Sequence, residues 1–301
     1  MAEQVGHSED YFGDYRDFWW NHDFLALMAS RLSWSTRRQV LDVGYGMGHW
    51  TRTLIPHLSA GTHITAVDRD PKWSVQRENW PTYLSHSQVS VHIQYGDATA
   101  LPFPDNSFDF VTCQTVLIHI AEPEKAIREM CRVLAPGGLL LCVEPDNFGT
   151  FASQNALVDT ASLAEEANRF AFVLAQHRGT IALGLGNHSL GGRLPRLLSE
   201  ASLTNIHVYL SDKAIPLYPP YQSDEQRAMI ADQQAWFASS LDFSRETVEE
   251  RYRAGGGDPA IFAEHWEREV RKRAQLEEAL AAQTYDEGGG VLMYLVSGIK
   301  I

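Results

Sequence analysis

Short apolar runs alternate with helical patterns between Gln39 and Glu144. Five of these runs have the length and composition of strands, at residues 40–43, 64–67, 89–95, 108–113 and 139–143. Residues 50–58 and 123–134 are predicted as helices, and Pro136-Gly137-Gly138 is predicted to end the second one. Strands that alternate with helices predict a largely parallel sheet with both faces covered.

The alternation ends beyond Glu144. Residues 147–190 are predicted to be mainly helical, and a short helix at 193–201 leads to a sixth strand at 206–210. The sequence SDEQ at 223–226 has the form of a capping box and predicts a helix. A glycine break at 255–257 is followed by an amphipathic helix at about 261–282, and 291–298 is predicted as the last strand.

This pattern predicts a division of the chain around one α/β core. The core takes residues 37–146 and is preceded by an N-terminal helical cap at 1–36. A helical insert at 147–190 follows, then 191–214 and 288–301 complete the core sheet, with a second helical segment at 215–287. We expect the second segment to be a substrate lid or, alternatively, a dimerisation surface.

The charge and composition narrow the classes of partner. A formal net charge of −13 argues against nucleic acid, and glutamates surround Arg271-Lys272-Arg273, which is typical of a solvated helix face. We find no apolar run near the roughly 20 residues of a membrane helix, and the polar, acidic N-terminus is unlike a signal peptide. The three cysteines form no C-x-x-C pair. We therefore expect a cytoplasmic protein without a disulfide framework or a metal site.

Three glycines stand on alternate positions directly after the first predicted strand, at Gly44, Gly46 and Gly48. Glycines there let the backbone approach a ligand and turn into a helix, although a tight turn without a ligand is the other interpretation. A dinucleotide site has the pattern G-x-G-x-x-G. Here the third glycine comes one residue early and His49 takes its place, which disfavours a nicotinamide dehydrogenase.

Acidic residues follow the next two predicted strands. Asp68 is placed to accept hydrogen bonds from both hydroxyls of a ribose, and Asp97 to accept one from an exocyclic amine such as that of adenine. The alternatives are a helix cap, for which Asp70 is the better candidate, and a loop acid. Because the tips of parallel strands face one edge of the sheet, we interpret these signals as one ligand site.

These segments resemble the class I S-adenosylmethionine-dependent methyltransferases, in the small-molecule branch that includes the ubiquinone and menaquinone methyltransferases. The matching stretches are LDVGYGMG at 41–48, VD at 67–68, GDATALPF at 96–103, SFD at 107–109 and RVLAPGG at 132–138. GRLPRLL at 192–198 is similar to the family's helix before the sixth strand. The resemblance implies a Rossmann-like fold with seven mostly parallel strands, helices on both faces and an antiparallel last strand.

The resemblance also implies S-adenosylmethionine as cofactor, with S-adenosylhomocysteine as product. Asp68 would bind the ribose, with Arg69 near the adenine, and Asp97 would bind the adenine amine beside the Ala98 amide. Tyr45 and Met47 depart from the family, which has smaller residues there. The implied cofactor residues are Asp42, Gly44, Tyr45, Gly46, Gly48, Asp68, Arg69, Asp97, Ala98, Gln114 and Thr115.

Methyl transfer needs mainly in-line positioning and exclusion of water, because the sulfonium already activates the methyl group. A base helps only if the acceptor must lose a proton. His119 and Glu144 are the candidates, with a structural histidine and a helix or loop cap as the alternatives. The aromatic residues predicted to line a substrate site or lid, or else to pack on the core or at an interface, are Tyr11, Tyr15, Trp19, Tyr218 and Trp236.

We therefore expect O- or N-methylation of a small molecule by in-line displacement, in a monomer or a homodimer. Carbon methylation of the quinone-biosynthesis type is an alternative. A protein that binds S-adenosylmethionine or S-adenosylhomocysteine without transferring the methyl group is another.

Overall fold

The computed structural model describes residues 14–73, 88–150, 161–238 and 244–301. The chain forms two compact units. We call one the sheet unit; it comprises Trp20–Asp146, His188–Asp212 and Leu292–Ile301. The other, the helical unit, comprises Met1–Trp19, Asn147–Asn187 and Lys213–Val291.

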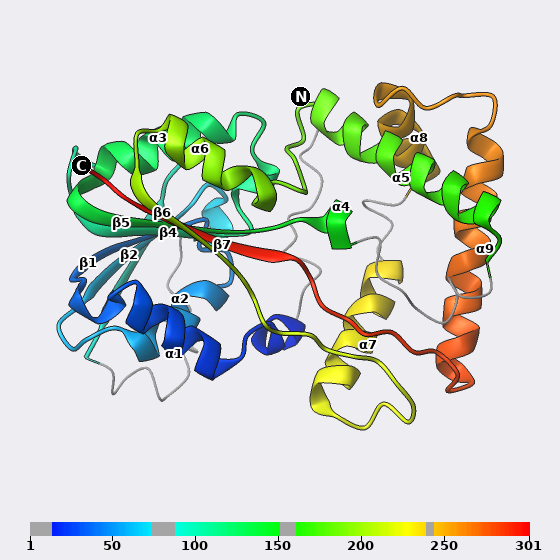
Figure 1. Ribbon diagram of the computed structural model, residues 1–301, viewed down its shortest axis with the longest axis horizontal. Helices are drawn as coiled ribbons and strands as arrows, with labels where there is room; N and C mark the ends of the chain where they lie inside the picture. Colours follow the sequence, from blue (N-terminus) through cyan, green and yellow to red (C-terminus); the bar gives the residue numbers. More distant parts are fainter. Residues whose placement is uncertain (1–13, 74–87, 151–160, 239–243) are drawn as a thin grey trace. The chain divides into compact units, whose positions relative to one another are not determined.

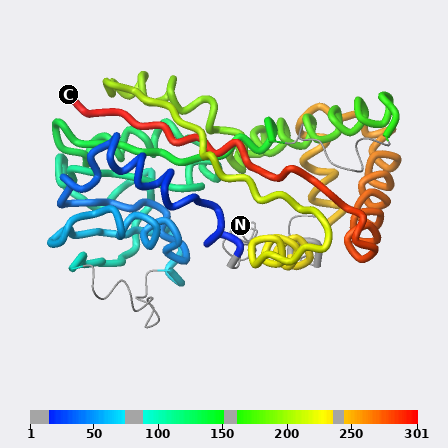
Figure 2. The backbone as a smooth tube through the Cα atoms, turned by 60° about the horizontal axis from the view of Figure 1, so that its bottom comes forward, coloured from blue at the N-terminus to red at the C-terminus, as the bar shows by residue number. Residues whose placement is uncertain are grey.

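The sheet unit is built on seven strands in the order β3-β2-β1-β4-β5-β7-β6. β1 to β5 pair in parallel, whereas β7 is antiparallel to both of its neighbours, β5 and β6. Figure 2 shows β7, in red, beside the green trace of β5. The predicted Rossmann-like sheet with an antiparallel last strand is confirmed. The strands are β1 (Gln39–Val43), β2 (His63–Asp68), β3 (Ser90–Tyr95), β4 (Phe108–Gln114), β5 (Leu134–Pro145), β6 (Thr204–Leu210) and β7 (Met293–Ile299).

Helices cover both faces of this sheet. Figure 1 shows α3 and α6 on one face and α1 and α2 on the other. Leu41 and Val111 pack in one buried core with Met130 of α3, because helix and strands each turn an apolar side to that layer. On the opposite face the ring of Trp50 lies 5.5 Å from Trp20, which confirms core packing for this part of the N-terminal aromatic cluster. The helices are α1 (His22–Arg31), α2 (His49–Leu54), α3 (Pro123–Val133) and α6 (Leu194–Glu200).

The prediction that Pro136-Gly137-Gly138 ends a helix is wrong. α3 already ends at Val133, and β5 starts at Leu134 and includes the three residues. The amide of Gly137 donates to the carbonyl of Lys300 (2.8 Å), and the amide of Lys300 donates to the carbonyl of Gly138 (3.1 Å). The residue after β7 therefore supplies the partners that keep this irregular stretch in the sheet.

The helical unit contains α4 (Asn147–Thr150), α5 (Leu163–Ala182), α7 (Asp224–Ala238), α8 (Arg245–Ala254) and α9 (Phe262–Ala281). The predicted capping box at the start of α7 is confirmed. The Gln226 amide donates to Oγ of Ser223 (3.1 Å), and the Ser223 amide donates to Oε1 of Gln226 (3.2 Å). Phe172, Tyr252 and Phe262 join α5, α8 and α9 in one buried cluster.

In the part of the chain that the structure describes, no helix combines the length and the apolar character needed to cross a bilayer. Among the same residues, no group of three or more His, Cys, Asp or Glu side chains is arranged to hold a metal ion.

Candidate functional site

The centre of the sheet carries the glycine loop. β1 pairs with β2 on one side and β4 on the other, so the direction of strand succession reverses at β1 and β4. Open α/β sheets bind ligands at the carboxyl ends of the strands beside such a reversal. The loop after β1 lies there: Gly44, Gly46 and Gly48 all have positive φ, at 78°, 50° and 77°. The loop thus adopts a backbone conformation that residues other than glycine rarely adopt.

Asp68, the last residue of β2, is tied to the glycine loop. Its side chain is 3% exposed. The Gly46 amide donates to Oδ2 (2.9 Å) and the Asp70 amide donates to Oδ1 (2.8 Å). Asp70 itself accepts from the Lys72 amide (3.0 Å), which confirms its predicted capping role at the short 3-10 helix Pro71–Trp73. Each oxygen of Asp68 keeps a second lone pair, so the carboxylate can also accept from a diol.

Asp97 lies at the next strand tip and is half-buried. Its Oδ1 accepts from both the amide (2.7 Å) and the hydroxyl (2.8 Å) of Thr99. Burial opposes ionisation, but the bonds from Thr99 and the charge of Arg69 together lower the pKa of Asp97. The side chain is therefore a fixed carboxylate at neutral pH. Its Oδ2 accepts no hydrogen bond from the described residues.

The side chain of Tyr45 explains one departure from the family pattern. It is buried and packs with Ala66 of β2 and Ile93 of β3. Its ring also lies across Gly48, where an added Cβ would come within 2.6 Å of the phenol oxygen. The bulky residue thus serves packing behind the loop. The carbonyl of Met47 accepts from Nη1 of Arg52 on α2 (2.8 Å), so this residue is also tied to the following helix.

The remaining predicted cofactor residues lie at the same edge. Asp42 is buried in β1 and accepts from the hydroxyl of Thr51, which joins the strand to α2. Gln114 ends β4, and Thr115 follows it with φ of 54° and its amide bonded to the carbonyl of Val143 (2.9 Å). Arg69 is exposed and Ala98 is buried.

Glu144 caps the turn that follows β4. Its Oε1 accepts from the amides of Val116 (3.0 Å) and Leu117 (2.8 Å), at the start of the 3-10 helix Leu117–His119. Complete burial raises the pKa of Glu144 to about 7, against the opposing effect of these amides. Oε2 is buried and has no hydrogen-bond partner among the described residues. Glu144 thus caps this turn, as one of the two interpretations predicted, and a catalytic role for it stays a prediction.

His119 is brought beside a residue that the sequence did not single out. Its ring lies 5.4 Å from the ring of His188, edge to face. The two histidines are far apart in the chain, and no local pattern marks the second one. The sheet unit includes both, and His188 lies beside the turn that follows β4. A catalytic role for His119 stays a prediction.

The predicted substrate and lid residues belong to the helical unit. Tyr15 and Trp19 pack edge to face with ring centres 6.2 Å apart, and burial near Asp232 and Glu287 raises the pKa of Tyr15 to about 12. Tyr218 is exposed. Tyr11 and the side chain of Trp236 lie outside the described part of the chain. Their roles stay predictions.

The sequence itself matches a known family in the region of this site. Residues 41–142 match the family described as "Methyltransferase domain". This segment is a class I methyltransferase domain. It lies wholly within the sheet unit and spans the glycine loop, Asp68, Asp97 and the turn after β4. The resemblance carried by those motifs is therefore confirmed.

Curated relatives of this methyltransferase domain are demethylmenaquinone methyltransferases. The protein of that name from Listeria welshimeri is 37% identical over 106 residues, which are 35% of this chain and 44% of the relative. The one from Staphylococcus aureus is 36% identical over 107 residues, which are 35% of this chain and 42% of the relative. The chain thus matches less than half the length of the curated relatives.

Two solved structures show similarity over a longer stretch. The YcgJ protein of Bacillus subtilis is 20% identical, with a TM-score of 0.49, and the match covers 93% of this chain and 99% of that one. Phosphoethanolamine N-methyltransferase 2 of Haemonchus contortus is 15% identical, with a TM-score of 0.45 and coverage of 99% and 60%.

Proposed function

We propose that this chain binds S-adenosylmethionine at the carboxyl edge of its sheet and transfers the methyl group to a small-molecule acceptor. One observation carries the proposal. The buried Asp68 carboxylate is bonded to the Gly46 amide at 2.9 Å, so ribose acceptor and glycine loop form one structure inside the methyltransferase domain. A loop that merely turned the chain would not need a buried carboxylate with lone pairs to spare.

The residues present fit the cofactor. The loop from Gly44 to Gly48 offers bare backbone to the methionine part, and Gln114 and Thr115 would face it from the end of β4. Asp68 would accept from both ribose hydroxyls. Asp97 would accept from the adenine amine, because Oδ1 is already occupied by Thr99 and Oδ2 is not bonded to the described residues.

The bound cofactor would supply an activated methyl group, so the protein's task is to hold and orient its reactants. Asp68 and the glycine loop would fix the donor, and the half-buried turn after β4 would exclude water on one side. Glu144 would keep that turn in place through the Val116 and Leu117 amides. His119 is the candidate to take a proton from the acceptor, where the acceptor carries one.

The acceptor is proposed only as a small molecule, methylated at oxygen or nitrogen. The names of the curated relatives favour a second candidate, carbon methylation of a quinone precursor. The monomer or homodimer and the lid or interface at 215–287 stay predictions.

Titration calorimetry of the full chain with S-adenosylhomocysteine, and separately with NADH, tests the proposal. We expect S-adenosylhomocysteine to bind and NADH not to bind. Tight NADH binding without a response to S-adenosylhomocysteine would overturn the proposal. Incubation with methyl-labelled cofactor and candidate phenols, amines and naphthoquinols, followed by mass spectrometry, then identifies the methylated atom. Binding without any labelled product would leave a cofactor-binding protein that does not transfer the methyl group.

A further inference from the structure

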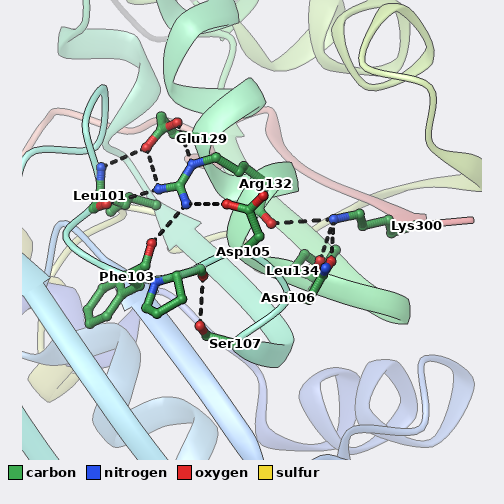
Figure 3. A network of polar contacts seen from close by, with 10 residues as sticks. Leu101, Phe103, Asp105, Asn106, Ser107, Glu129, Arg132, Leu134 and Lys300 are labelled. Carbon is green, nitrogen blue, oxygen red and sulfur yellow. Dashed lines mark hydrogen bonds and ion pairs between the residues drawn. The ribbon is translucent and has the colours of Figure 1, made fainter.

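Arg132, near the end of α3, is the centre of a polar network in the sheet unit (Figure 3). A guanidinium has five N–H donors. The side chain of Arg132 makes five bonds of 2.8–3.0 Å, which occupy that whole capacity. The acceptors are both carboxylate oxygens of Glu129, the carbonyls of Leu101 and Phe103, and Oδ1 of Asp105.

The segment that this network holds begins at Asp97. The Ala100 amide donates to the carbonyl of Asp97 (3.0 Å), which closes a turn, and Leu101 follows at once. The Leu101 amide donates to Oε2 of Glu129 (2.9 Å), and its carbonyl accepts from Nη2 of Arg132 (3.0 Å). Leu101 is buried, so its backbone groups need these protein partners. Two side chains of α3 thus fix the residue that ends the Asp97 turn.

The two α3 side chains also fix one another. Hydrogen bonds from Arg132 lower the pKa of Glu129, which remains a carboxylate able to accept from the Leu101 amide. A lysine in place of Arg132 would offer three donors on one atom and would not span Leu101, Phe103 and Glu129 together. The geometry therefore requires arginine.

We propose, building on the cofactor site proposed above, that Arg132 is a positioning residue for adenine recognition. By holding Leu101 and Phe103 it fixes the turn that aims Oδ2 of Asp97 at the exocyclic amine. A hydrogen bond to a carboxylate requires a donor–acceptor distance near 2.9 Å, so a shift of about 1 Å in this turn removes most of the discrimination for adenine.

The same network contains a matched control. Nζ of Lys300 donates to Oδ1 of Asn106 (2.8 Å) and to the carbonyls of Leu134 (2.6 Å) and Arg132 (3.4 Å). These bonds secure the end of the loop, the backbone at the end of α3 and the start of β5, and none of them reaches Leu101 or the guanidinium of Arg132. A Lys300→Met variant therefore loses network bonds without releasing the Asp97 turn. Arg196→Gln removes an exposed Arg–Glu pair on α6 and controls for loss of charge.

The test compares two ligands by calorimetry on the full chain: S-adenosylhomocysteine, and S-inosylhomocysteine, in which a carbonyl oxygen replaces the adenine amine. The wild type should prefer the first by about tenfold to a hundredfold, the worth of one hydrogen bond to a charged group. Arg132→Gln should reduce that ratio at least fivefold. Lys300→Met and Arg196→Gln should keep the wild-type ratio, whatever their melting temperatures.

The outcomes separate the two proposals. A wild type that binds neither ligand overturns the cofactor site and the role of Arg132 with it. A wild type that discriminates, beside an Arg132→Gln variant with the same ratio, overturns only the positioning role. If Lys300→Met reduces the preference between the two ligands as much as Arg132→Gln does, the positioning role is also overturned. General loosening of the loop would then be enough to explain the loss of discrimination. If Arg132→Gln does not fold, Arg132→Lys takes its place in the test. It should likewise reduce the preference for S-adenosylhomocysteine over S-inosylhomocysteine, and an unchanged preference would overturn the positioning role.

Discussion

Gly44 and Val116 meet so closely that no side chain fits between them: a Cβ atom on Gly44 would lie 2.2 Å from Cγ2 of Val116. The first residue of the glycine loop is thereby packed against the turn after β4, across the point where the order of strands reverses. This contact joins the proposed methionine-binding loop to the turn that carries His119.

Gly44→Ala should destabilise the sheet unit for two reasons, the φ of 78° and the overlap with Val116. Gly61→Ala is the matched control, because Gly61 has φ of 80° and nothing within 4 Å of an added Cβ. We expect Gly61→Ala to cost about 1–2 kcal/mol and Gly44→Ala about 1–3 kcal/mol more, by urea unfolding. Adding Val116→Ala to Gly44→Ala should recover part of the difference. Equal costs for the two glycines would contradict the contact.

Asp68→Ala should weaken binding of S-adenosylhomocysteine by about 1–3 kcal/mol, because two ribose hydroxyls lose their acceptor. Part of that loss arises in the protein, since the Gly46 amide loses the same carboxylate. A 2′-deoxyribose analogue of S-adenosylhomocysteine separates the two effects. With this ligand, the part of the Asp68→Ala loss that comes from the ribose hydroxyls should shrink, and the part that comes from the glycine loop should not. Asp70→Ala removes the cap of Pro71–Trp73 and an ion pair with Lys72 but leaves Asp68 in place, so it should leave the dissociation constant near that of wild type. An unchanged dissociation constant for Asp68→Ala refutes the ribose assignment.

The pattern of apolar residues was sufficient to predict the strands and a largely parallel sheet, because each strand shows either a buried run or a period of two. The antiparallel last strand was implied only by the family resemblance, and the order of the strands comes from the structure. The start of β5 could not be predicted in this way. Proline and two glycines predict a break, but the partner that keeps Gly137 in the sheet is Lys300, which is remote in sequence.

The roles of the functional residues could likewise be predicted where they depend on local sequence, but not where they depend on contacts between distant segments. The turn capped by Asp70 is local, and its cap could be assigned from sequence. The role of Glu144 depends on amides of Val116 and Leu117 on the neighbouring strand's turn, and the neighbour of His119 is His188 from a distant segment. Single-sequence patterns carry no signal for such contacts, because they form only when the sheet assembles.

Glu144→Gln should change how stability depends on pH. The carboxyl has a raised pKa of about 7 when folded and an ordinary value of 4.5. Between these values the folded protein holds a proton that the unfolded chain has lost, so the stabilising contribution is complete below about pH 4.5 and is lost as the pH rises through about 7.

The neutral glutamine lacks this titration. The difference in unfolding free energy, wild type minus Glu144→Gln, should therefore fall between pH 4.5 and pH 8 by an amount on the order of 3 kcal/mol. Urea unfolding of both proteins at four or five pH values measures this difference. The contributions of other titrating groups cancel because both proteins contain them. A difference that does not vary with pH, or that grows as the pH rises, contradicts the raised pKa.

Gly179 and Gly255 should govern the stability of the helical unit, because α5 and α8 touch there backbone to backbone. A Cβ on Gly179 would lie 1.6 Å from the carbonyl oxygen of Arg251, and one on Gly255 would lie 1.8 Å from that of Ala175. Alanine is intrinsically the better helix former by about 1 kcal/mol, so Gly179→Ala would stabilise an unpacked helix. We expect instead a net loss of at least about 2 kcal/mol, because the helices must separate to admit the methyl group.

Gly288→Ala is the control for the helical unit, since an added Cβ there meets nothing within 4 Å. Hydrogen exchange locates the effect: amides of α5 and α8 should lose protection in Gly179→Ala and Gly255→Ala, while amides of β1 and β4 keep theirs. The two helices belong to one compact unit and the two strands to the other, so the loss should stop at the boundary between units. Uniform loss in helices and strands alike would mean that the two units unfold as one.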